Sequence, residues 1–302
     1  MSVTVRVPAK VNVQLAVGAA RPDGFHDLAN VFLAVGLHDD VTATAADELT
    51  LTCEGPGADQ VPLDRTNLAA RAAIALGERY GIEPRVHLHI DKDIPVAGGM
   101  AGGSADAAGA LVACDALWGT GATRDELLDI CAELGSDVPF SLVGGAALGT
   151  GRGEKLQLLD VGGEFWWVFA AADGGLSTPA VYGEFDRIAE NTAGRAIPEP
   201  EASPALLDAL RSGDATALAA TLTNDLQPAA LSLFPALKDT LDAGTAAGAL
   251  AGLVSGSGPT TAFLCADETS ARAVAAALTA SGTCRSVRVT TSPAPGATVV
   301  QR

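Results

Sequence analysis

The chain has 302 residues, a length that allows two domains. Hydrophobic residues make up 48% of it and charged residues 18%, which is typical of a globular protein and excludes a disordered one. The 36 acidic residues outnumber the 19 basic ones and give a net charge of −17, which argues against binding to nucleic acid or to an anionic membrane surface.

Alternating apolar and polar residues near the start of the chain predict a strand pair, or one bent strand, over residues 3–17, with Pro8 at a break in its ladder. Lys10 and Asn12 are two residues apart, so their side chains point the same way. Lys10 could lie on a solvated face of the strand or face a site, and the sequence favours neither interpretation. The turn that follows leads to His26, and a lone histidine is more often a surface residue than a functional one.

The next stretch predicts short strands separated by acidic turns, followed by a helix. The strands are expected at residues 31–36, 41–44 and 49–53, and the helix at residues 67–80. Asn67 or Thr66 would cap the start of this helix, because their side-chain oxygens can accept from its first amides.

The rest of the chain is organised around residues 94–108, Ile-Pro-Val-Ala-Gly-Gly-Met-Ala-Gly-Gly-Ser-Ala-Asp-Ala-Ala. They lie between a predicted strand at residues 86–90 and an alanine-rich helix at residues 105–118. Glycine lets the backbone approach a ligand closely, and the first amides of a helix lack partners within it. Two glycine pairs followed by Ser104 therefore favour a phosphate-binding loop over a tight structural turn.

The loop does not match the two commonest phosphate motifs. No Gly-Lys-Ser/Thr follows the glycines, which excludes a Walker A loop, and Ala97 stands where a dinucleotide fingerprint has its first glycine. The loop carries no lysine, so positive charge must come from elsewhere in the chain and from a metal ion. Asp106, in the first helical turn, suits the helix dipole as a structural residue, and contact with a metal through water is the weaker alternative.

A capping box formed by Thr123 and Glu126 predicts a helix that ends at Leu134. Asp137 follows, just before Pro139, which is tolerated in the first turn of a new helix. A helix cap is the favoured interpretation of Asp137, and a carboxylate held rigidly for function is the alternative.

A domain boundary is predicted near residues 161–163, which divides the chain into residues 1–161 and 162–302. The glycine-serine loop at residues 255–260 is by itself more often an ordinary turn than a ligand site, and the tail from Ser292 is expected to fray. The other elements expected in the second half are strands at residues 146–150, 155–159, 165–171, 249–254, 261–265 and 285–290, and helices at residues 177–188, 235–246 and 268–280.

The five cysteines show no metal-binding spacing and lie mostly among apolar residues, which predicts small core residues in a reducing compartment. No signal peptide and no apolar run long enough for a bilayer is found in the sequence. We therefore expect a cytoplasmic protein that does not enter a membrane.

Three of these stretches together resemble the GHMP kinases: Pro-Ala-Lys-Val-Asn at residues 8–12, Gly-Gly-Met-Ala-Gly-Gly-Ser at 98–104 and Gly-Ser-Gly-Pro-Thr at 256–260. Two more, Arg-Pro-Asp-Gly-Phe-His-Asp-Leu at 21–28 and Gly-Ser-Asp-Val-Pro-Phe at 135–140, are similar to the branch that acts on 4-diphosphocytidyl-2-C-methyl-D-erythritol. The resemblance extends over nearly the whole chain, and the combination is far more specific than any single motif.

The resemblance implies an α+β fold of two domains, with the active site in the cleft between them. It implies an enzyme that uses ATP and Mg²⁺ to phosphorylate the 2-hydroxyl of this small molecule in non-mevalonate isoprenoid precursor synthesis. The metal ligands and the oligomeric state are left open. The rival interpretations are another small-alcohol kinase of the homoserine or mevalonate type, a non-catalytic nucleotide-binding module, and a nicotinamide-dependent enzyme.

The resemblance also implies roles for single residues. Asp137 would be the general base for the substrate hydroxyl, with Lys10 beside it. The substrate would contact Asn12, Phe25, His26 and Tyr182, with His26 at the cytosine edge and the two aromatic rings stacked on cytosine. The ATP phosphates would be wrapped by Pro95, Val96, Ala97, Gly98, Gly99, Met100, Ala101, Gly102, Gly103, Ser104 and Ala105.

The sequence departs from the family pattern at three of these positions. Phe25 stands where a tyrosine is common, so the ring remains but a phenol hydroxyl is lost. Ala105 replaces a second serine, which removes one hydroxyl near the metal, and Ala101 interrupts the glycine run.

Overall fold

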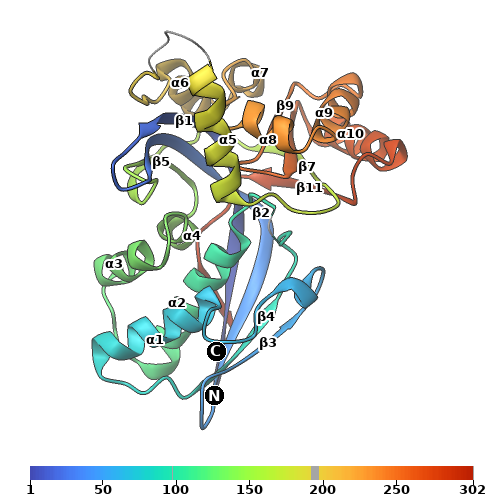
Figure 1. Cartoon of the computed structure of the whole chain (residues 1–302). Helices are drawn as coiled ribbons and strands as arrows, with labels where there is room; N and C mark the ends of the chain where they lie inside the picture. The colour runs from blue at the N-terminus through green and yellow to red at the C-terminus, as the bar shows by residue number, and fades with distance from the viewer. Residues whose placement is uncertain (97, 192–196, 302) are drawn as a thin grey trace.

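The computed structural model describes residues 1–96, 98–191 and 197–301. Within them the chain forms two sheets with helices against both, which confirms the α+β prediction (Figure 1). The first sheet has the strand order β12-β1-β2-β4-β3, with β5, β6 and β8 joined to it off this path. Its strands are β1 (Ser2–Ala20), β2 (His26–Ala45), β3 (Thr50–Glu54), β4 (Val86–Asp91), β5 (Ala146–Thr150), β6 (Lys155–Leu159), β8 (Thr223–Asn224) and β12 (Thr298–Gln301).

The second sheet has the order β11-β7-β10-β9, and α9 and α10 pack against it. Its strands are β7 (Phe165–Ala171), β9 (Ala251–Val254), β10 (Thr260–Cys265) and β11 (Ser286–Ser292). The helices are α1 (Leu68–Tyr80), α2 (Gly102–Trp118), α3 (Arg124–Leu134), α4 (Val138–Val143), α5 (Thr178–Asn191), α6 (Pro204–Ser212), α7 (Ala215–Ala219), α8 (Gln227–Leu233), α9 (Leu237–Ala246) and α10 (Glu268–Ser281). Among the described residues, each helix is too short or too polar to cross a bilayer.

The hairpin of β1 and β2 forms the long axis of the molecule. The two strands pair antiparallel from Ser2↔Thr44 to Ala20↔His26, with a register shift after Pro8, which has no amide to donate. The separate strands predicted at residues 31–36 and 41–44 are therefore wrong, because β2 continues through both. Buried residues recur along its whole length, so the acidic residues between them do not interrupt it.

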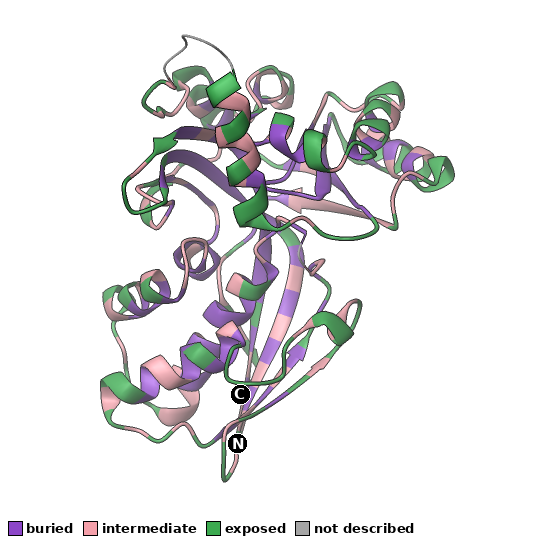
Figure 2. Ribbon diagram, in the orientation of Figure 1, coloured by how far each residue is buried: buried purple, intermediate pink, exposed green. Residues whose placement is uncertain are grey.

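Helix α2 lies at the centre of the first half of the chain. It packs against β1 and β2 on one side and against α1 on the other, and Figure 2 shows it largely buried. Its small side chains permit this close approach: a Cβ at Gly109 would lie within 2.9 Å of side-chain atoms of Val7 and Val41. Packing of this kind holds the start of α2, and the glycine loop before it, in a fixed place.

The C-terminal segment does not fray as predicted. Residues Thr298–Gln301 form β12, which pairs with β1, and Figure 1 shows the two termini next to each other. The segment is ordered because its backbone pairs with β1 and because Val299 packs against the core. Strands β8 and β12 thus return to the first sheet, and the division at residue 161 stays a prediction.

Candidate active site

A cavity of about 850 Å³ is lined by residues from both halves of the chain. Its size is that of a small-molecule binding site. Among the segments that meet there are β1, the start of β2, the start of α2, the turn before α4, helix α5 and the loop between β9 and β10. All six predicted catalytic and substrate-binding residues line the cavity, and five of them are buried or half-buried, Phe25 being exposed.

The glycine loop forms one wall of this cavity. Helix α2 begins at Gly102, three residues earlier than predicted, and Ala101 caps it in the left-handed conformation with φ 62°. A non-glycine residue rarely adopts this conformation, so the surrounding packing must hold it there. The loop residues that line the cavity are Gly98, Gly99, Ala101, Gly102, Gly103 and Ser104.

The other predicted loop residues are placed differently. Met100 and Ala105 are fully buried, and their side chains pack in the hydrophobic core. Pro95 and Val96 lie outside the cavity lining, and Ala97 lies outside the described residues. Phosphate contacts by these residues stay predictions.

The second glycine loop packs directly on the first. The Ser255 hydroxyl donates to the Gly99 carbonyl at 3.1 Å, and the Thr260 amide donates to the Gly98 carbonyl at 3.3 Å. A Cβ at Gly99, where φ is 73°, would lie 2.1 Å from the Ser255 carbonyl, so only glycine allows this contact. Because Gly256, Ser257 and Gly258 also line the cavity, the second loop is part of the site and more than an ordinary turn.

Lys10 lies where the two glycine loops meet. Its side chain is buried, and its Nζ donates to Asn12 Oδ1 at 2.6 Å and to the Gly99 carbonyl at 2.9 Å. Asn12 in turn donates to Asn30 Oδ1 at 2.7 Å. Burial lowers the pKa of Lys10, and the charge of Asp137 opposes that shift. The site-facing alternative for Lys10 is therefore confirmed.

Asp137 stands at the N-cap position of α4 but does not cap it. Its backbone is in the right-handed helical region, and its side chain accepts no capping hydrogen bond. The favoured interpretation as a cap was thus wrong. Its Oδ2 lies 3.7 Å from Lys10 Nζ, and 32% of its side chain is exposed. A carboxylate that is freed from capping, held near an ammonium and open to a cavity can accept a proton from a ligand.

The remaining predicted residues, Phe25, His26 and Tyr182, also line the cavity. His26 is buried, and its Nε2 lies 2.9 Å from Asp186 Oδ1. Its ring centre is 5.0 Å from that of Tyr182, while the Phe25 ring faces the Arg152 guanidinium at 5.1 Å. Within the described residues, no ring contact joins Phe25 to Tyr182, so their predicted joint action on a base stays a prediction.

Asp186 and Arg152 also line the cavity, and the sequence analysis missed both. Asp186 could have been found, because it lies four residues after Tyr182 on a predicted helix and therefore shares its face. Arg152 lies in the turn between two short strands, and nothing in its local sequence indicates where it points.

Comparison with known proteins identifies the family. The model of the GHMP kinases N terminal domain matches residues 67–145, and that of the GHMP kinases C terminal domain matches residues 206–284. Over 300 residues the chain is 79% identical to the 4-diphosphocytidyl-2-C-methyl-D-erythritol kinase of Streptomyces avermitilis, a match that covers 99% of this chain and 100% of that one. The chain belongs to this kinase family.

Two solved structures agree with this assignment. A crystal structure of 4-(cytidine 5'-diphospho)-2C-methyl-D-erythritol kinase has a TM-score of 0.76 and 33% identity, and covers 95% of this chain and 98% of that one. The homoserine kinase from Cytophaga hutchinsonii has a TM-score of 0.75 but only 19% identity, over 99% of this chain and 97% of that one, so it shows the shared fold alone. The chain is thus an ATP-dependent kinase with the GHMP fold, and the nicotinamide-dependent alternative is not supported.

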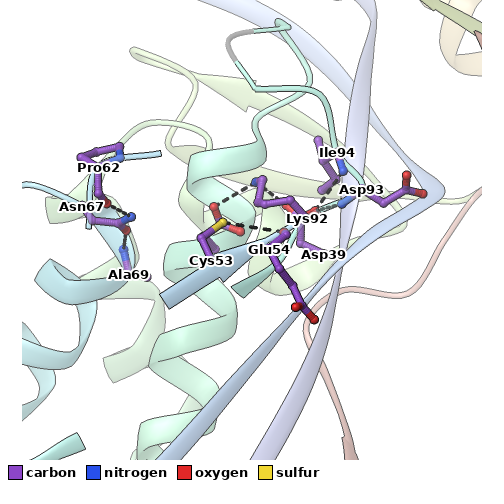
Figure 3. A network of polar contacts seen from close by, with 10 residues as sticks. Asp39, Cys53, Glu54, Pro62, Asn67, Ala69, Lys92, Asp93 and Ile94 are labelled. Atoms are coloured by element: carbon purple, nitrogen blue, oxygen red, sulfur yellow. Dashed lines mark hydrogen bonds and ion pairs between the residues drawn. The ribbon is translucent and has the colours of Figure 1, made fainter. Parts of the chain in front are cut away.

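Next to the glycine loop of this kinase lies a buried ionic cluster that the sequence analysis did not predict. Lys92 Nζ donates to Asp39 Oδ2 at 2.6 Å (Figure 3), and it also donates to Asp106 Oδ2 at 3.0 Å. Asp39 also accepts the backbone amides of Asp93 and Ile94, which lead into the loop. Asp106 is therefore a structural residue, which was the favoured interpretation. Because α2 begins at Gly102, Asp106 lies beyond its first turn, so its partner is the buried Lys92 and the predicted role of the helix dipole is wrong.

The cluster predicts a pH-dependent stability. Burial raises the pKa of Asp106 to about 7, while an unfolded aspartate titrates near 3.9. The folded protein then holds more protons than the unfolded chain between these values, so this residue costs stability as pH rises from about 4 to about 7. We expect Asp106→Asn to become more stable relative to the native protein as pH rises. The difference between their two melting midpoints should shift in favour of the variant by about 2 °C or more from pH 5 to pH 8. A midpoint difference that is the same at both values contradicts the assignment.

Metal ligands are not apparent in the side chains alone. In the described part of the chain, no group of three or more His, Cys, Asp or Glu residues is placed to hold a metal ion. A kinase does not need such a cage, because magnesium is usually held by substrate phosphates with one or two carboxylates and water. Asp137 and the Ser104 hydroxyl are the lining groups that suit this arrangement beside the glycine loop.

Proposed function

We propose that this chain transfers the γ-phosphoryl group of ATP to the 2-hydroxyl of 4-diphosphocytidyl-2-C-methyl-D-erythritol, with Mg²⁺ as the metal, in non-mevalonate isoprenoid precursor synthesis. The observation that carries the proposal is the 3.7 Å approach of Asp137 to Lys10 at the mouth of the glycine loop. It brings together a proton acceptor, a cation and a phosphate site from three distant segments of the chain.

Asp137 acts as the general base in this proposal. Phosphoryl transfer requires little covalent work from a protein, because positioning and charge neutralisation supply most of the catalysis. The Asp137 carboxylate accepts the proton of the attacking hydroxyl, and the Lys10 ammonium lies 3.7 Å from this carboxylate. Asn12 holds the ammonium in place through its 2.6 Å hydrogen bond.

The glycine loop binds the triphosphate in this proposal. The first amides of α2 have no partners within the helix. Their residues, Gly102, Gly103 and Ser104, line the cavity, so these amides can bind phosphate oxygens there. Each hydrogen bond to a charged oxygen contributes roughly 1.5–3 kcal/mol, more than the helix dipole. Bound magnesium neutralises phosphate charge, and Lys10 supplies the cation that the loop lacks.

The part of the cavity lined by Phe25, His26 and Tyr182 binds the cytidine part of the substrate in this proposal. Phe25 and Tyr182 offer aromatic surface for the base, and His26 offers a ring nitrogen at its edge. Phosphate and base sites lie in one cavity, so one substrate can reach both, which supports a nucleotide-linked acceptor over a small one such as homoserine or mevalonate.

We also propose that this reaction takes place in the cytoplasm, with small molecules as its partners. The cysteines are free thiols in the structure, as expected in a reducing compartment. They are Cys53, Cys114, Cys131, Cys265 and Cys284.

The test is ADP release from ATP and Mg²⁺ with and without the cytidylated acceptor. We expect release only with that acceptor, and a product that carries a new phosphate monoester on its 2-hydroxyl. Homoserine and mevalonate are the matched alternatives, and faster release with either would move the chain to another branch of the superfamily. If the chain binds ATP but releases no ADP with any of these acceptors, it is a non-catalytic nucleotide-binding module.

A further inference from the structure

His26 and Asp186 form a hydrogen bond at the wall of the cavity. His26 opens β2 and is only 6% exposed, and Asp186 lies on α5 with 35% of its side chain exposed. Their Nε2 and Oδ1 atoms are 2.9 Å apart, and both residues line the cavity. The pair therefore lies at the surface that a ligand in the cavity touches.

The Asp186 carboxylate selects one tautomer of the His26 imidazole. An ionised aspartate only accepts hydrogen bonds, so Nε2 must carry the hydrogen. In a neutral ring the other nitrogen, Nδ1, is then unprotonated and accepts. No hydrogen bond from the described residues reaches Nδ1. His26 thus offers an acceptor that the rest of this part of the chain leaves unused.

Helix α5 supplies both the carboxylate and the aromatic surface. Tyr182 and Asp186 are four residues apart, so they lie on one face of the helix. The His26 ring is 5.0 Å from the Tyr182 ring and 5.9 Å from the Phe185 ring, which it meets edge-on. Glu184, another acid of α5, is two residues from each of them and so faces another way, and it binds Arg187 and Ser232. Asp186 is therefore the acid that acts on His26.

We propose that Asp186 is a specificity-determining residue, which positions His26 as an acceptor and so selects a 4-amino pyrimidine over a 4-oxo pyrimidine. The inference rests on the proposed function for its location at the base end of the cavity. The amino group of cytosine donates to an acceptor, whereas the corresponding oxygen of uracil would face it with no hydrogen between them. A buried acceptor left without a partner is the kind of mismatch by which sites reject close analogues.

The test compares the native protein with Asp186→Asn. The asparagine amide can donate to Nε2, which moves the ring hydrogen to Nδ1 and turns the acceptor into a donor. We expect the native protein to bind CDP at least about tenfold more tightly than UDP, and the variant to lose most of that preference. The KM for the cytidylated acceptor should rise at least about tenfold, while kcat and the KM for ATP stay within about threefold.

Two further variants separate positioning from folding. Asp186→Glu keeps the carboxylate and should restore part of the CDP preference. Glu190→Gln removes an exposed charge from the same helix, outside the cavity lining, and should change neither preference nor KM. Nitrogen NMR of His26 should show hydrogen on Nε2 in the native protein and on Nδ1 in Asp186→Asn.

The inference is overturned if the native ring carries hydrogen on Nδ1, alone or together with Nε2. It is also overturned if Asp186→Asn keeps the native preference for CDP. Both readouts are independent of turnover. If the native protein prefers CDP but phosphorylates no cytidylated acceptor, the proposed function fails while this inference stands.

Discussion

Asp137→Asn should lower kcat by a factor of about 10² to 10⁴, the contribution of a positioned general base. Asparagine has nearly the same shape, but its amide does not accept the proton of the attacking hydroxyl. Lys10 keeps its hydrogen bonds to Asn12 and to the Gly99 carbonyl, so the glycine loop stays in place. Affinity for ATP should therefore remain within about threefold of native, as measured by equilibrium binding.

Asp125→Asn is the matched control for this experiment. Asp125 also lies in the first turn of a helix, but it is exposed and outside the cavity lining. It should leave kcat and the affinity for ATP unchanged. If Asp137→Asn keeps more than about one tenth of native kcat, Asp137 is not the base.

Lys92→Met should be the most destabilising single change in the first half of the chain. It leaves Asp39 and Asp106 buried at 0% and 3% exposure without their shared cation. Removing one partner of a buried ion pair costs about 3–5 kcal/mol, a large part of a typical folding free energy of about 5–15 kcal/mol. Chemical denaturation should show this loss as a lower midpoint with an unchanged slope.

A second lysine provides the control. Lys238 pairs with Asp242 on the surface of α9, where 65% and 64% of the two side chains are exposed. Lys238→Met should have little effect on the midpoint, because exposed pairs are screened by water and salt. Adding Asp106→Asn to Lys92→Met should recover part of the loss, since one buried charge disappears. Equal midpoints for the two lysine variants would refute a structural role for the cluster.

Local signals predicted the elements that depend on nearby residues. The helix start at Asn67 is confirmed, since its side chain accepts the Ala69 amide, and the capping box of Thr123 and Glu126 is present. The pairing of Lys10 with Asn12 follows from their spacing in a strand, which any extended backbone enforces. Such features need only a few neighbouring residues, so the sequence contains them in readable form.

Features that depend on distant residues could not be predicted in this way. The hydrogen bond from Ser255 to the Gly99 carbonyl joins segments far apart in the chain, and so does the ion pair of Lys92 with Asp39. Asp137 was expected to cap a helix because local rules favour it, but its backbone conformation turns the carboxylate toward Lys10. The resemblance to the GHMP kinases supplied that role, which spacing and composition alone did not.

The most direct test of the account is a double-mutant cycle on the rate of phosphoryl transfer in a single turnover. Lys10→Met, Asp137→Asn and the double variant are compared with the native protein at saturating ATP and acceptor. Because the ammonium and the carboxylate are 3.7 Å apart and act on one proton, the double variant should be only slightly slower than the slower single variant, with a coupling of at least about tenfold. If the two losses multiply to within about twofold, Lys10 and Asp137 act independently and the account is contradicted.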